Sequence, residues 1–180
     1  MEIDPTLPIE RTAVYYAILA RLATAPSLGI DPVLGSPAAY EGEVPDIIAL
    51  AQGDDGQPDG SGRVAPYLAL YDMWDNPLQV SRSWRFGGTG ASYEGALADN
   101  AQETTITYQV TCVAGWMSDC LTLIDEVHPL LFRWSPTVDG LNCGRLQTVG
   151  QQFGPRRDMT LGALPPRFYA PLSYAVTVYR

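Results

Sequence analysis

The sequence predicts an α+β domain, in which a mainly antiparallel sheet has two helices packed on one face. Three observations predict this class. In two segments hydrophobic residues recur every three or four positions, the period of a helix with one buried face. In several other segments hydrophobic and polar residues alternate, the period of a strand with one buried face. The elements follow in the order helix, loop, strands, helix, strands, which favours an antiparallel sheet covered on one side.

Both helices are located by an apolar stripe. In the first, expected over residues 9–24, Val14, Ile18 and Leu22 repeat every four positions and therefore lie on one side of the helix. The second helix is expected over residues 119–132. Its buried stripe is expected to comprise Cys120, Ile124, Val127 and Leu131. The two stripes provide the apolar surface that must cover the sheet.

Four segments are expected as strands, namely residues 64–71, 105–113, 146–149 and 174–179. The second of them alternates most regularly. Its buried face is expected to carry Ile106, Tyr108, Val110 and Cys112, and its other face Thr105, Thr107, Gln109 and Thr111. A strand with this pattern has one face in the core and the other toward solvent.

Residues 25–62 have a different composition. Proline, glycine and aspartate are frequent, and the segment closes with residues 53–62, which read Gly-Asp-Asp-Gly-Gln-Pro-Asp-Gly-Ser-Gly. These residue types favour turns over regular elements. We therefore expect a single domain over residues 1–180, of a size that one core can support, with residues 25–62 as a long acidic loop or arm.

The composition argues against several classes of function. The net charge is −9 and the isoelectric point is near 4.4, the wrong sign for a general nucleic-acid binder. No apolar run approaches the length of about 18 residues that a membrane span requires, so we expect no membrane partner. Three cysteines without a CxxC spacing favour buried free thiols over a disulfide framework or a zinc site.

Candidate catalytic and metal-ligating residues are few. His128 is the only histidine, and Asp125 lies three residues before it on the expected second helix, where the two share a face. Residues 87–90, Gly-Gly-Thr-Gly, lack the lysine and the spacing of a phosphate-binding loop. The aspartates of residues 53–62 do not follow a calcium-loop pattern. We expect no enzyme, cofactor or metal, and a small binding or hydrolytic domain centred on His128 stays an alternative.

Charge is distributed unevenly along the chain. Residues 1–62 hold ten acidic residues and two arginines, whereas residues 130–180 hold six arginines and two acidic residues. All eleven basic residues are arginines, which are well suited to ion pairs at interfaces. The asymmetry would let one end of a subunit attract the opposite end of another. Ordinary solvated surface is the alternative, because isolated surface ion pairs contribute little.

Two parts of the sequence carry a family resemblance. In residues 105–131 a strand containing Gln109-Val-Thr111 is followed by a glycine turn and a helix that ends in a leucine pair. Residues 155–169 begin Pro-Arg-Arg-Asp, end Pro-Pro-Arg-Phe-Tyr, and lead into the last alternating strand. Together with the first helix and the strand at residues 66–71, these segments resemble the tail terminators of long-tailed bacteriophages that infect actinobacteria. The arm at residues 25–62 departs from the family pattern.

The resemblance implies a structural protein of the virion, assembled in the host cytoplasm. It implies a six-fold ring of α+β subunits that caps the head-proximal end of the tail tube, stops its growth and offers a docking surface to the head connector. The partners would be further copies of the chain, the tail tube protein and the connector or stopper protein, and the genomic DNA would pass through the lumen unread. Another neck protein, a head-completion or stopper subunit, is the runner-up.

A closed ring requires two different patches on each subunit that fit one another. The arginines of the C-terminal third and the acids of the arm are the candidates for these patches. The residues expected at the contact are Arg145, Arg156, Arg157 and Arg167 on one side, and Glu41, Glu43 and Asp46 on the other.

Overall fold

The computed structural model describes residues 11–42, 44, 48–53, 56–73, 103–158 and 165–179. Within these residues two helices and a seven-stranded, mostly antiparallel sheet confirm the α+β class. The elements in chain order are α1 (Arg11–Leu22), β1 (Ala39–Glu41), β2 (Tyr67–Asp72), β3 (Glu103–Ala114), α3 (Met117–Leu131), β4 (Asn142–Cys143), β5 (Gln147–Thr148), β6 (Arg156–Arg157) and β7 (Phe168–Tyr179).

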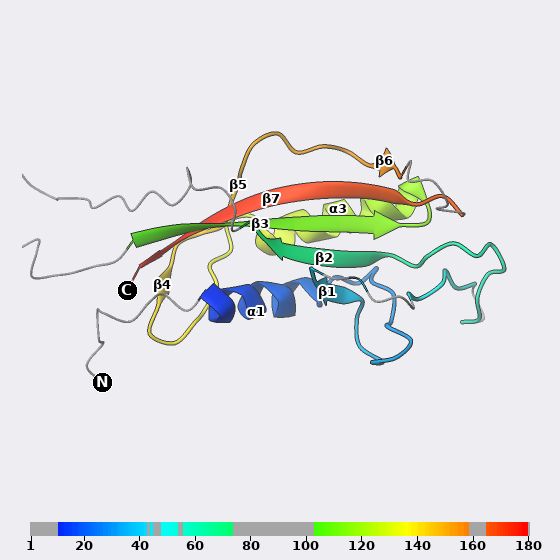
Figure 1. The fold of residues 1–180 in the computed structure, drawn as a ribbon, viewed down its shortest axis with the longest axis horizontal. Helices are drawn as coiled ribbons and strands as arrows, with labels where there is room; N and C mark the ends of the chain where they lie inside the picture. The colour runs from blue at the N-terminus through cyan, green and yellow to red at the C-terminus, as the bar shows by residue number, and fades with distance from the viewer. Residues whose placement is uncertain are drawn as a thin grey trace, which may run out of the picture.

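The sheet is built around its two longest strands, β3 and β7, which run antiparallel along their whole length. On one side β2 pairs antiparallel with β3, and β1 joins β2 in the parallel direction. On the other side β4, β5 and β6 each pair with a different part of β7. β1 and β6 therefore lie at opposite edges of the sheet, as Figure 1 shows.

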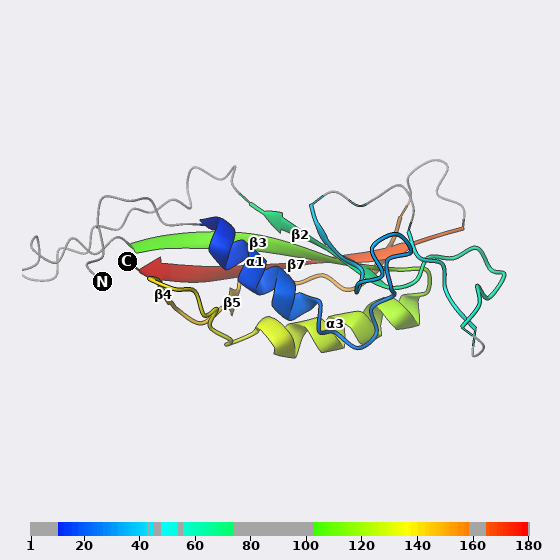
Figure 2. The same cartoon turned by 90° about the horizontal axis from the view of Figure 1, so that it is seen from below.

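Both helices lie on the same face of the sheet (Figure 2) and share one core with it. Val14, Ile18 and Leu22 of α1 are fully buried, as the four-residue spacing predicted. From the sheet, alternate residues of β2, β3 and β7 enter the same core. Tyr108 and Tyr174, which face each other across β3 and β7, are its largest fully buried side chains.

The buried stripe of α3 differs from the prediction at one position. Leu123 is fully buried, whereas Ile124 is only partly buried. Leu123 and Ile124 are each three or four residues from both Cys120 and Val127, so helical spacing alone does not decide which of the two enters the core. The remaining members are buried as expected, namely Cys120, Val127 and Leu131.

The last strand is longer than predicted. β7 begins at Phe168 rather than at residue 174, and it contains Pro171. Proline cannot donate a hydrogen bond to a strand ladder and argues against a central strand. Here β7 is paired continuously only with β3, and its other edge is paired in short pieces. The strands β1, β4 and β6 were not predicted, because two or three residues are too few to show an alternation.

The described part of the arm is not a separate unit. β1 belongs to it, and Ala38 and Tyr40 pack with Tyr67 and Val113 in a second, smaller cluster. Tyr67 and Val113 point to the face opposite the helices, because their neighbours in β2 and β3 enter the main core. The arm thus covers one end of that face. The expected contact residues Glu43 and Asp46 lie outside the described residues, as do residues 87–90.

The junction between β3 and α3 depends on a glycine. A Cβ atom at Gly115 would lie 2.6 Å from the Cβ of Arg63 and 2.8 Å from the carbonyl oxygen of Val64. No larger residue fits so close to backbone. The close approach lets the amide of Gly115 donate to the Val64 carbonyl at 3.0 Å, which ties the start of α3 to the segment that leads into β2.

Candidate functional site

Among the residues that the structure describes, two consecutive arginines lie at β6. Arg156 and Arg157 are both exposed there, at the edge of the sheet formed along β7. The guanidinium of Arg156 lies 4.4 Å from the ring centroid of Phe153, a side chain that is itself 41% exposed. An arginine held over an aromatic ring keeps its donors available for a partner. Arg156 and Arg157 are therefore both accessible to solvent at this edge.

The opposite edge of the sheet carries one exposed acidic residue in β1. Glu41 ends β1 and is exposed, and the hydroxyl of Tyr16 donates to its Oε2 at 3.3 Å. The structure thus puts Glu41 and the β6 arginines on the two far edges of one sheet. The two sets are too far apart in the strand order to pair within one chain, and each remains turned toward solvent.

The other two predicted arginines differ from each other. Arg145 is exposed next to the fully buried Leu146, on the β7 side of the sheet. Arg167 is partly buried and serves the fold, because it hydrogen-bonds to the phenol of Tyr67 and opposes the rise in the pKa of Tyr67 that burial causes. Arg145 is therefore available to a partner, whereas Arg167 is largely engaged within its own chain.

A rigid turn precedes β1 and was not expected from the sequence. The carboxylate of Asp31, which is 2% exposed, accepts from the amides of Val33 at 2.8 Å and Leu34 at 2.6 Å, and from the Tyr40 hydroxyl at 2.9 Å. These hydrogen bonds, the one from the Leu34 amide first, lower the pKa of Asp31. A bridge between Ile30 and Pro37 closes the turn.

The turn presents two apolar side chains to solvent. Val33 is 70% exposed and Leu34 is 74% exposed, which makes them the most exposed of the large hydrophobic residues described. We call this pair the hook. The signal for it in the sequence is Asp31-Pro-Val-Leu-Gly35, two aliphatic residues inside a turn motif. We read that motif only as loop, because turn residues indicate a change of direction and not what the turn displays.

A second exposed apolar patch lies on α3. Met117 and Leu121, one helical turn apart, are 48% and 46% exposed. We call this pair the α3 flank. Trp116, just before the helix, is 43% exposed and carries the guanidinium of Arg63 at 3.5 Å from its ring centroid. Exposed large apolar side chains that cluster in this way mark candidate contact surfaces.

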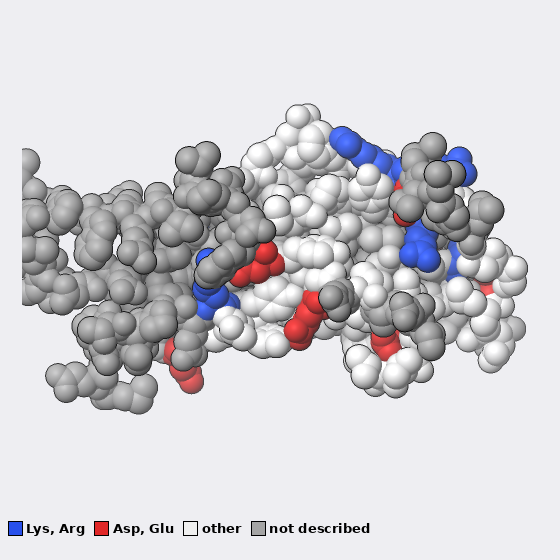
Figure 3. Space-filling view, in the orientation of Figure 1, with Lys and Arg blue, Asp and Glu red and all other residues white. Residues whose placement is uncertain are grey.

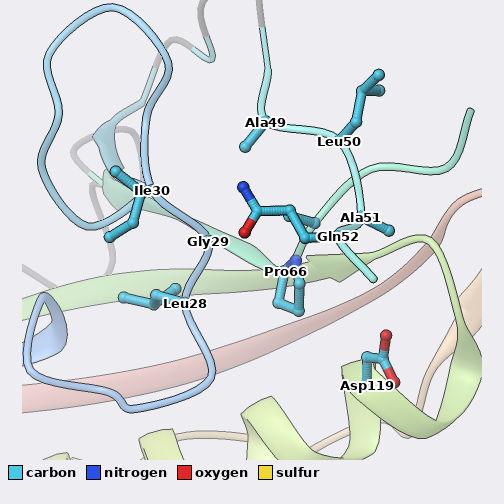
Figure 4. Close-up of a pocket in the computed structure, with 10 residues that line it drawn as sticks. Leu28, Gly29, Ile30, Ala49, Leu50, Ala51, Gln52, Pro66 and Asp119 are labelled. Atoms are coloured by element: carbon cyan, nitrogen blue, oxygen red, sulfur yellow. The ribbon is translucent and has the colours of Figure 1, made fainter. Parts of the chain in front are cut away.

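A small cavity lies between the arm and the start of α3 (Figure 4). Its volume is about 240 Å³, and its walls are mostly apolar side chains and backbone. Gln52 projects into it, and Asp119 stands apart on α3. The residues around it are Leu28, Gly29, Ile30, Ala49, Leu50, Ala51, Gln52, Ala65, Pro66 and Asp119. These residues offer no nucleophile paired with a base, so the cavity suggests no reaction.

The only histidine has a packing role. The Nδ1 atom of His128 lies 3.2 Å from the hydroxyl of the buried Tyr174, and its ring stacks on Phe132 with the centroids 5.0 Å apart. Asp125, considered above as its partner, is exposed. Among the residues described, no three His, Cys, Asp or Glu side chains gather as they would around a metal ion. His128 therefore joins α3 to β7 and is not part of a recognisable site.

The three cysteines are free thiols. Cys112 and Cys120 are buried as expected, whereas Cys143 is partly exposed. Burial raises the pKa of the Cys120 thiol to about 11 and raises that of Cys112 further. Because the thiolate is the reactive form, these two residues are unsuited to nucleophilic chemistry.

No protein-family model matches the chain, and no curated protein matches its sequence significantly. No helix among the described residues has the length and hydrophobicity needed to cross a membrane.

Proposed function

We propose that the chain is a structural subunit of a bacteriophage tail, which assembles into a ring of six copies on the head-proximal end of the tail tube. The ring ends the growth of the tube and offers a surface to the head connector. The proposal rests on the resemblance of residues 105–131 and 155–169 to tail terminators. The observation that supports it is the opposite charge of the two edges of the sheet.

That arrangement of charge supports the association of copies. Figure 3 shows arginine side chains in blue around β6 and acidic side chains in red on the opposite side, near β1. A chain with Arg156 and Arg157 on one edge and Glu41 on the other can attract a second copy head to tail. Such a contact joins two different patches, and it closes into a ring when the rotation between neighbours permits.

The face of the sheet away from the helices suits the wall of a lumen through which DNA passes without being bound. Residues 105–111 and 171–177, in the middle of β3 and β7, include no charged residue. On this face they present half-exposed threonine, glutamine, serine, proline and alanine side chains. A surface without arginine or lysine forms no ion pairs with DNA phosphates, so it does not bind the DNA backbone.

The charged contact is tested by reversing its sign. In a double variant Arg156→Glu, Arg157→Glu, we expect rings seen by native mass spectrometry and negative-stain imaging to be lost, because both edges become acidic. Adding Glu41→Arg should restore part of the assembly. The control Arg21→Glu, Arg133→Glu makes the same change of net charge at other exposed arginines and should leave the rings unchanged. Rings that survive the reversal at β6 would remove this contact from the proposal.

A second experiment tests whether the protein caps tail tubes. Purified protein is added to tail tubes, and binding is scored at each end of the tube by electron microscopy. Caps at one end of the tubes support a terminator. Rings that ignore tubes but bind an isolated head connector would favour another neck protein, and a chain that stays monomeric at all concentrations would overturn the ring.

A further inference from the structure

We propose that the hook of one copy packs on the α3 flank of the next copy. We call this apolar contact the anchor. The inference deepens the proposed function and rests on it in one respect, that copies of the chain associate. It names the residues at the centre of the contact, whereas the charges of β1 and β6 form its rim.

The hook is fixed before any partner arrives. A buried carboxylate is unfavourable unless hydrogen bonds compensate it, and Asp31 receives three of them, from Val33, Leu34 and Tyr40. The evident result of this network is a turn whose two aliphatic side chains point into solvent. An anchor that is already ordered loses little conformational entropy on binding. The turn is therefore built for contact and not merely for changing the direction of the chain.

The α3 flank faces away from the hook. On α3, Glu126 accepts a hydrogen bond from the amide of Ser27 at 3.0 Å, and Asp119 lines the cavity beside Ile30. These residues mark the side of the helix that faces the segment leading to the hook. With 100° per residue, Met117 and Leu121 lie about 160° around the helix from Asp119. The two apolar patches thus lie on opposite sides of the subunit, where they cannot meet within one chain.

Charge complementarity identifies the occupant as a second copy. The hook leads directly into β1, which ends at the exposed Glu41. The α3 flank lies on the β7 side, where His128 of the same helix contacts Tyr174 and where β6 pairs with the start of β7. The hook therefore lies on the side of the subunit that carries Glu41, and the flank lies on the side that carries the β6 arginines, where Asp125 is also exposed one helical turn beyond Leu121.

When the hook of one copy meets the flank of the next, the acidic edge of the first also meets the β6 arginines of the second. An apolar centre with a charged rim is the usual anatomy of a protein interface. Figure 1 shows the separation, with the turn before β1 on the lower side of the sheet and β6 on the upper side.

The experiment uses two broken interfaces that can complement each other. One full-length variant carries Val33→Asp and Leu34→Asp, which spoils the hook, and the other carries Met117→Asp and Leu121→Asp, which spoils the flank. We expect the protein concentration at which half of the chains are assembled to be at least about 30-fold higher for each variant alone than for wild type. This is the effect expected when a residue at the centre of an interface is lost. All four side chains are exposed, so folding, checked by circular dichroism, should not change.

The mixture of the two variants is the decisive sample. An intact flank on the first variant can still receive the intact hook of the second, so a one-to-one mixture should give dimers and nothing larger. The control Ser118→Asp, Thr122→Asp adds the same charge on another exposed side of α3 and should assemble like wild type. Mixed samples that stay monomeric, or a hook variant that assembles like wild type, would overturn the anchor.

The outcome also separates this inference from the proposed function. Wild-type protein that forms rings, with hook and flank variants that form them equally well, would leave the ring standing and remove only the anchor. A wild-type chain that remains monomeric at every concentration would overturn both.

Discussion

The two faces of the β3–β7 ribbon differ sharply in burial, although the same two strands form both. On the helix-covered face, Ile106 and Tyr108 of β3 and Val176 of β7 are buried almost completely. One residue along, Thr105 and Thr107 are half-exposed on the other face. The comparison teaches that stability is concentrated on one face, and that the other face and the arm are free to serve contacts.

The largest expected effect tests the covered face. Replacing Leu123 of α3 with alanine leaves a cavity in the core and should lower the free energy of unfolding by about 2–5 kcal/mol, measured by urea denaturation. Leu121→Ala is the matched control on the same helix, where the side chain is 46% exposed, and should change it by at most about 0.5 kcal/mol. Equal losses would mean that the two sides of α3 are not packed as described.

A smaller effect distinguishes neighbouring residues of β7. Val176→Thr puts a hydroxyl among apolar side chains of the core and should cost about 1–3 kcal/mol of unfolding free energy. Ala175→Thr adds the same hydroxyl to the other face, where it meets solvent, and should change the value by at most about 0.5 kcal/mol. Thermal unfolding of both variants checks the pair, and a reversed order would break the comparison of the faces.

The smallest effect concerns the turn of the arm at Asp31, which is held by hydrogen bonds. The pKa of Asp31 is lowered in the folded protein, so its contribution to stability is present above the pKa of an unfolded aspartate, about 3.9. That contribution is lost as the pH falls through the lower, folded pKa. Asp31→Asn cannot titrate, so the gap in unfolding free energy between wild type and variant should narrow as the pH is lowered below about 3.9. A gap that stays constant would mean that the Asp31 carboxylate contributes nothing to the arm.

The sequence predicted best what periodicity controls. The burial of Val14, Ile18 and Leu22, and the alternation in β3, follow from one-sided contact with a core. Periodicity failed where an element was too short to show it, as in β1 and β6, and where Pro171 concealed the first half of β7. In those cases pairing with a neighbouring strand decides the structure, and the sequence of one segment does not show which strand it pairs with.

The candidate site was predicted only in part. The excess of arginine near residues 156–157 and of acid near residue 41 could be counted, and the topology then brings them to opposite edges. The hook could not be foreseen, because its rigidity comes from a hydrogen bond between Asp31 and Tyr40, nine residues apart, as well as from the local turn. The α3 flank was hidden for another reason. A helix pattern distinguishes buried from exposed positions but does not single out an exposed leucine.

The outer edge of β7 has a consequence for how the protein behaves at high concentration. Between the stretches paired with β5 and β6, the side-chain amide of Gln152 donates to the carbonyl of Ser173 and accepts from its amide, both at 3.1 Å, as a neighbouring strand would. Pro171, in the same gap, offers no donor at all. This edge is thereby closed to the open-ended strand addition from which amyloid grows. At this edge, contacts between crowded copies are left to side chains.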